Sequence, residues 1–154
     1  MDRAPQLFAD DFVVGFPFRG EAKALTTELF AQFAALTGDA HPIHYDEAYA
    51  AGTRFGRPLA HGLLLTSLTA FGATSLSRSV EDSMIALLEQ RMRFQHPAFI
   101  GDVVVPEFEV VSMEPTASGR TGRVEMAVRL LNQAGEHVIE GRHAYLLRRR
   151  PLAA

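Results

Sequence analysis

The spacing of apolar residues changes period along the chain, and its first half predicts helices. Residues 26–37 carry apolar side chains at helical spacing, and Gly38 follows as a helix stop. Asp46 can cap a short helix that runs through Ala51. The uncharged stretch 62–77 predicts one long helix of about 17 residues; it is too short and too rich in Ser, Thr and Gly to span a membrane.

The second half of the chain alternates apolar and polar residues, which indicates strands. Four such segments are expected at residues 85–94, 103–113, 122–131 and 137–147, with a tight turn joining the last two. A short, irregular strand is also expected near residues 12–18. An antiparallel sheet packed on one long apolar helix is an α+β arrangement.

The composition of the chain excludes several classes of function. The chain has 154 residues, which suits a single domain over 1–154, and it contains no cysteine, so thiolate catalysis and cysteine-bound metal sites are excluded. The formal charge of -3 argues against a nucleic-acid partner. The first residues lack a basic segment followed by an apolar run, so we expect a cytoplasmic protein with no membrane partner.

The densest candidate chemistry lies between the first helix and the long helix. Asp39 and His44 form a natural proton-transfer pair, since a carboxylate can orient an imidazole and stabilise its charged form. Gly62, at the start of the long helix, offers a backbone N–H with no side chain to block a close approach. Spacing alone leaves two alternatives open: a structural polar loop, or a metal site formed with His41 and His61.

Two motifs carry a family resemblance. The run FAALTGDAHPIHYDEAYAAGTRFGRPLAHGLLLTSL resembles the signature of the MaoC-like dehydratases, which include the R-specific enoyl-CoA hydratases of hotdog fold. The later run RFQHPAFIGDVV is similar to the second landmark of that family. The resemblance implies a single hotdog domain, in which an antiparallel sheet wraps around one long central helix.

The resemblance also implies an activity. Asp39 and His44 would activate one water for addition to a trans-2-enoyl-CoA, giving an (R)-3-hydroxyacyl-CoA, or catalyse the reverse dehydration. The Gly62 N–H would receive the thioester oxygen as it gains negative charge. No metal and no cofactor is implied beyond coenzyme A, which is part of the acyl-CoA substrate. The family further implies a homodimer or a higher oligomer with active sites near the subunit interface.

Other residues of the two motifs and of the long helix are expected to contact substrate. His41 departs from the family pattern, which usually has Asn there, so the hydrogen bonding of this loop differs. The phosphates of coenzyme A call for arginine at the mouth of the site, and the acyl group calls for apolar walls. The expected substrate-binding residues are His41, Pro42, Arg57, His61, Leu64, Leu68, Phe71 and Phe94.

Two other functions remain open on the sequence. A hotdog thioesterase would also bind acyl-CoA, but would direct water at the thioester carbonyl with a carboxylate. A non-catalytic subunit would bind acyl thioesters without turnover. The presence of both Asp39 and His44 favours the hydratase over each of these.

Overall fold

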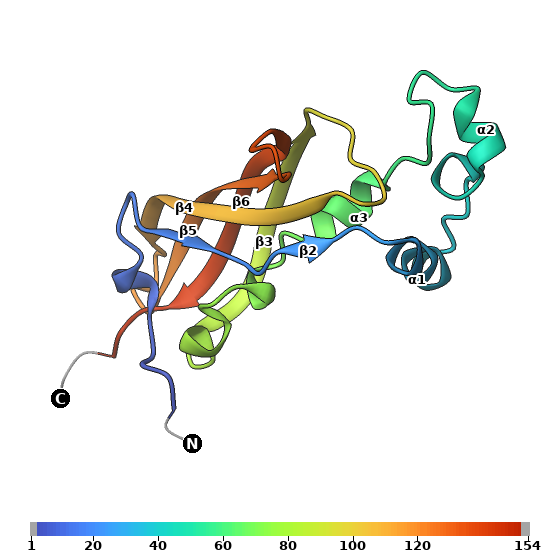
Figure 1. The fold of residues 1–154 in the computed structure, drawn as a ribbon. Coiled ribbons are helices and arrows are strands. Elements are labelled where there is room, and N and C mark those ends of the chain that lie inside the picture. Colours follow the sequence, from blue (N-terminus) through green and yellow to red (C-terminus); the bar gives the residue numbers. More distant parts are fainter. Residues whose placement is uncertain (1–2, 152–154) are drawn as a thin grey trace.

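One antiparallel sheet forms most of the protein, as the computed structural model over residues 3–151 shows (Figure 1). Its strand order is β1-β4-β5-β6-β3, and β2 also pairs with β4. The predicted antiparallel sheet is therefore confirmed. The strands are β1 (Pro17–Arg19), β2 (Lys23–Ala24), β3 (Met84–Phe94), β4 (Val103–Pro115), β5 (Thr121–Leu131) and β6 (His137–Arg148).

The alternating pattern of β5 explains how the sheet acquires one buried face. Val124, Met126, Val128 and Leu130 are completely buried, while the residues between them are partly exposed. Because side chains alternate across a strand, this face packs inward along the whole length of β5.

Local capping places the helices of the first half. The Thr26 side chain accepts a hydrogen bond from the Leu29 N–H (3.1 Å) at the start of α1 (Thr27–Thr37). Gly38 then adopts a left-handed conformation with φ +79° and ends the helix. Short turns η1 (Ala9–Asp11) and η2 (Pro42–His44) and the helix α2 (Glu47–Ala51) complete this half. Figure 1 shows α1 and α2 beyond one end of the sheet, away from both termini.

The central helix is much shorter than the sequence predicts. The α3 helix covers only Gly62–Ser67, and the 3-10 turns η3 (Phe71–Ala73) and η4 (Ser77–Val80) follow it. The Ser67 hydroxyl donates to the Leu64 carbonyl (2.6 Å), and the Thr69 hydroxyl donates to the Thr66 carbonyl (2.7 Å). Such hydroxyls compete with the helical N–H groups for backbone carbonyls, so the prediction of one long helix over 62–77 is wrong.

Two apolar clusters fill the space between the sheet and the helical segments. One cluster contains residues of η1, η3, β4, β5 and β6. The other contains residues of α1 and α3 and the residues of β5 and β6 that lie next to the turn joining these two strands. Phe30 of α1 and Leu64 of α3 belong to the second cluster, which therefore supports the loop between these helices. In the part of the chain that the structure describes, no helix is long and apolar enough to cross a membrane.

Candidate active site

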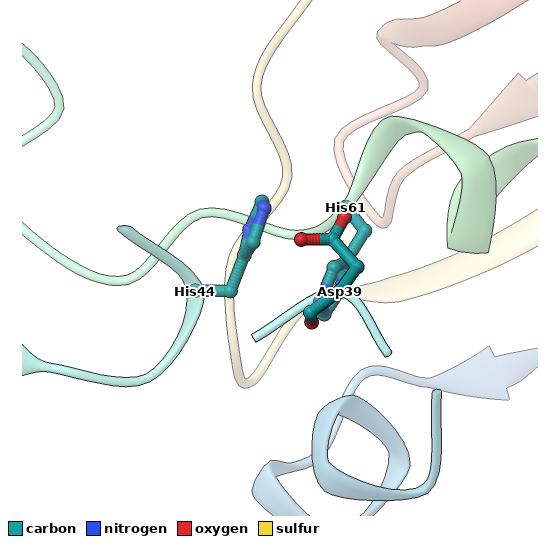
Figure 2. Close-up of side chains that lie close together, drawn as sticks. All are labelled: Asp39, His44 and His61. Carbon is teal, nitrogen blue, oxygen red and sulfur yellow. The ribbon is translucent and has the colours of Figure 1, made fainter. Parts of the chain in front are cut away.

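Three side chains from separate turns meet in the loop between α1 and α3 (Figure 2). Asp39 directly follows the Gly38 helix stop, His44 ends η2, and His61 is the N-cap of α3. Their carboxylate oxygen and ring nitrogen atoms lie within 4.8 Å of one another. The predicted pair of Asp39 and His44 is thus brought together, with His61 as a third member.

The His44 ring has a defined tautomer. Its Nδ1 lies 2.6 Å from the Leu59 carbonyl oxygen, which can only accept a hydrogen bond. Nδ1 therefore carries the proton, and in the neutral ring the lone pair is on Nε2. Nε2 has no hydrogen-bond partner among the described residues, so it is free to accept a proton from a bound water.

The backbone around Asp39 is held on both sides. Its N–H donates to the Thr37 hydroxyl (3.2 Å), and its carbonyl accepts from the Tyr45 hydroxyl (2.8 Å). One carboxylate oxygen accepts a long hydrogen bond from the His41 N–H (3.4 Å). The other oxygen has no partner within residues 3–151, which leaves it available to a water or a substrate.

His61 is a buried support for the other two residues. It is 1% exposed, and its ring stacks on His44 with centroids 3.8 Å apart. The Phe33 ring packs on it as well, and its Nε2 is hydrogen-bonded to the Tyr45 hydroxyl. Burial lowers the pKa of His61, and a charge on His44 lowers it further. His61 is therefore a neutral ring that holds the His44 imidazole in place.

The ring geometry does not fit the alternative of a metal site. A metal ion bound by imidazole lies near the ring plane, about 2 Å from the nitrogen. The His44 and His61 planes are only 23° from parallel, with centroids 3.8 Å apart, so they intersect well away from both rings. An ion bonded to both rings would lie out of at least one ring plane, so the arrangement suits proton transfer better than metal binding.

Gly62 begins α3 beside this group. No hydrogen-bond partner of its N–H is found in the described part of the chain, so the N–H can donate to a ligand. The Phe94 ring approaches so closely that a Cβ on Gly62 would lie 3.0 Å from two ring atoms. Since α3 has only six residues, the dipole of a long helix is not available, and the N–H itself would supply the stabilisation.

The sequence matches a known protein family and its members. A sequence profile described as MaoC like domain matches residues 13–132. The chain belongs to the MaoC-like domain family. It is 35% identical over 111 residues to an (R)-specific enoyl-CoA hydratase of Aeromonas caviae, covering 72% of this chain and 78% of that protein.

Solved structures agree with this MaoC-like assignment. An R-hydratase from Pseudomonas aeruginosa has a TM-score of 0.75 at 29% identity, covering 97% of this chain and 93% of that chain. A Mycobacterium tuberculosis protein with a double hotdog fold has a TM-score of 0.74 at 21% identity, covering 99% of this chain and 47% of that chain. The MaoC-like domain therefore has the predicted α+β hotdog fold.

His41 and Pro42 of this MaoC-like domain shape the loop. The His41 Nδ1 accepts a hydrogen bond from the Ile43 N–H (3.2 Å), which caps η2, and Pro42 is the first residue of that turn. An Asn oxygen could make the same bond, so His41 replaces the usual residue without removing the cap.

The other residues expected to contact substrate lie in different parts of the structure. Leu64 is buried and Leu68 partly buried in the second apolar cluster, so both pack in the core. Phe94 is 58% exposed, and with Gly62 and Arg54 it lines a small pocket of about 200 Å³. The Arg57 guanidinium lies over the Phe99 ring, 3.9 Å from its centroid.

A larger cavity of about 690 Å³ lies beyond the C-terminal end of α3, and Phe71 contributes to its wall. Its wall also contains Gln90, His143 and Tyr145, which sequence reasoning missed. Tyr45, which bonds both His61 and Asp39, was missed as well. The position of Tyr45 next to His44 was a usable signal, whereas nothing local marks the other three.

Proposed function

We propose that this MaoC-like domain is a hydro-lyase that reversibly adds water to a trans-2-enoyl-CoA, giving an (R)-3-hydroxyacyl-CoA. The free Nε2 lone pair of His44 beside the Asp39 carboxylate carries the proposal. The relatives support it, because the A. caviae protein is an (R)-specific enoyl-CoA hydratase by name.

The proposed step uses groups of this chain only. A water held by Asp39 and His44 gives one proton to His44 Nε2 while its oxygen bonds to C3 of the enoyl group. The thioester oxygen gains negative charge and accepts a hydrogen bond from the Gly62 N–H. The same pair returns a proton to C2, so the net change is addition of one water. This step involves no oxidation or reduction and requires no metal or cofactor.

Loss of the enoyl absorbance of crotonyl-CoA tests this activity. We expect the wild type to hydrate crotonyl-CoA, and Asp39→Asn and His44→Ala to lower the rate by about 100-fold or more. Asp82→Asn and His137→Ala change the same residue types outside the site, so they should leave the rate unchanged. Equal rates in the wild type and both site variants would overturn the proposal.

Products separate this activity from its alternatives. The proposed hydratase gives the R product and releases no thiol from saturated butyryl-CoA. Free thiol from butyryl-CoA would indicate a thioesterase, and binding of acyl-CoA without any product would indicate a non-catalytic subunit. An S product would contradict the R-specific assignment.

The free edge of β3 supports a homodimer as the working form. Within the described residues, β3 pairs only with β6, which leaves an 11-residue edge open. Ile85, Leu87 and Leu88 on this strand are 44%, 52% and 49% exposed. Long apolar edges are normally paired or covered, and a second copy of β3 offers a matching antiparallel edge.

A further inference from the structure

The 690 Å³ cavity has a polar wall that faces a mainly apolar side. The mainly apolar side is formed by η3, η4 and the start of β3, and the Thr66, Ser67 and Ser77 hydroxyls and the Glu81 carboxylate also line the cavity. On the opposite side stand Gln90 of β3 and His143 and Tyr145 of β6. The apolar lining residues include Phe71, Val80, Met84, Ile85 and Leu87.

The polar wall is a connected hydrogen-bond network. The His143 Nδ1 lies 3.0 Å from the Tyr145 hydroxyl, and its Nε2 lies 2.9 Å from the Gln90 amide nitrogen. His143 is 1% exposed and Tyr145 is 5% exposed. The Thr69 hydroxyl also lies 3.4 Å from Nε2, so both ring nitrogens of His143 are engaged within the protein. Gln90 is exposed, and its amide retains its oxygen and a second N–H. The buried Thr66 hydroxyl, which also lines the cavity, has no hydrogen-bond partner among the described residues.

The network carries no charge near neutral pH. Burial lowers the pKa of His143 to about 4 and raises the pKa of Tyr145 to about 12. Among the described lining residues, Glu81 is the one with a charged side chain, and none is Lys or Arg. A ligand carboxylate would therefore find no cation here, whereas a hydroxyl or a ketone could bond to Gln90.

The cavity begins about one helical turn from the proposed reaction site. Gly62 opens α3, and Thr66 of the same helix lines the cavity, about 6 Å further along the helix axis. An acyl group whose thioester oxygen meets the Gly62 N–H would extend along α3 towards the polar wall. A plain alkyl tail would cover the Gln90 amide without replacing its hydrogen bonds to water.

We propose that this cavity selects acyl groups that carry an uncharged oxygen substituent on their distal carbons, and that Gln90, oriented by His143, binds this substituent. The proposal deepens the hydratase function and rests on it for the identity of the ligand. Acyl groups with a plain alkyl end, or with a carboxylate end, should bind less well.

Calorimetry with saturated acyl-CoAs tests the selection independently of catalysis. The probes are octanoyl-CoA, 8-hydroxyoctanoyl-CoA and the CoA thioester of octanedioic acid. We expect the wild type to bind the hydroxylated probe about tenfold more tightly than either of the others. Gln90→Met should remove this preference, whereas Gln32→Met, an equivalent change at an exposed residue of α1 that does not line the cavity, should retain it.

The outcomes separate this proposal from the hydratase function. Equal or tighter binding of octanoyl-CoA by the wild type, or an unchanged preference in Gln90→Met, would overturn the selection. Tightest binding of the carboxylate probe would also overturn it. Hydration of crotonyl-CoA, whose four-carbon acyl group has no distal oxygen, is measured in the same experiment. If the wild type does not hydrate crotonyl-CoA, the hydratase function is contradicted. The binding preference among the three octanoyl probes then still tests the selection.

Discussion

The imidazole rings of His44 and His61 stack with their centroids 3.8 Å apart and their planes 23° from parallel. Burial lowers the pKa of His61, so this ring stays neutral beside His44. A neutral buried partner restricts the motion of the His44 ring without adding a repulsive charge when His44 takes up a proton. The Leu59 carbonyl decides which ring nitrogen of His44 carries the proton in the neutral ring.

Tyr45 should position this pair. Its hydroxyl donates to the Asp39 carbonyl (2.8 Å) and is hydrogen-bonded to His61 Nε2. Burial and the nearby Asp39 charge raise the pKa of Tyr45, so the hydroxyl keeps its proton. Tyr45→Phe leaves the buried His61 Nε2 and the Asp39 carbonyl with only a long contact to each other (3.4 Å), and we expect it to lower the free energy of unfolding by about 1–3 kcal/mol. We also expect kcat to fall about tenfold, with KM less affected, because the orientation of Asp39 is lost.

Thermal unfolding and steady-state kinetics measure both effects. Tyr49→Phe is the matched control, because Tyr49 is 47% exposed and its hydroxyl has no hydrogen-bond partner among the residues that the structure describes. A Tyr45→Phe variant with wild-type stability and kcat would show that this hydroxyl has no positioning role.

The contact of Gly62 with Phe94 predicts a defect in activity rather than in folding. A Cβ at position 62 would lie 3.0 Å from the Phe94 ring, but this ring is 58% exposed and can move aside. We expect Gly62→Ala to change the free energy of unfolding by no more than about 1 kcal/mol. We expect kcat/KM to fall about tenfold or more, since the methyl group and the displaced ring crowd the N–H.

The double variant Gly62→Ala/Phe94→Leu separates the two sources of crowding. If the ring causes the loss, this variant should recover part of kcat/KM relative to Gly62→Ala. Wild-type kcat/KM in Gly62→Ala would mean that no reacting group approaches this N–H.

His143 should make the protein less stable in acid. Its pKa is lowered from 6.5 to about 4 in the folded protein, so between these values the unfolded chain binds the proton and the folded chain does not. The contribution of His143 to the free energy of unfolding is therefore complete above about pH 6.5 and decreases as the pH falls towards about 4. A shift of this size corresponds to about 3 kcal/mol, and the lowered pKa of His61 acts in the same direction.

Urea unfolding at about pH 7 and about pH 4.5 measures this loss. His143→Gln cannot titrate in this range, so it should lose less stability than the wild type between the two pH values. An equal loss in both proteins would assign the acid sensitivity to other groups.

The free edge of β3 predicts how the dimer can be broken. Leu88 is 49% exposed on this strand and does not line the large cavity. A charge there opposes strand pairing, so we expect Leu88→Lys to convert the dimer into a monomer in sedimentation experiments. Val14→Lys changes a residue that is 71% exposed outside β3 and should leave the dimer intact. A dimeric Leu88→Lys protein, or a monomeric wild type, would contradict pairing through this edge.

Elements that depend on neighbouring residues were predictable from the sequence. The Gly38 stop and the Asp46 cap involve a backbone angle or a hydrogen bond within a few residues, and both are present. The antiparallel strands follow from alternation of apolar residues, which does not require knowledge of their partners. The closeness of Asp39 and His44 also follows, because the loop that carries them is short and contains Pro42.

Features that the pattern of apolar residues does not encode emerged only in the folded chain. The length of α3 was decided by hydroxyl groups that bond to backbone carbonyls, a competition that apolar spacing does not reveal. The support of His44 by His61, and the network of Gln90 with His143, join residues far apart in the sequence. Such contacts arise because strand register and core packing bring these side chains together, and neither is encoded in a local pattern.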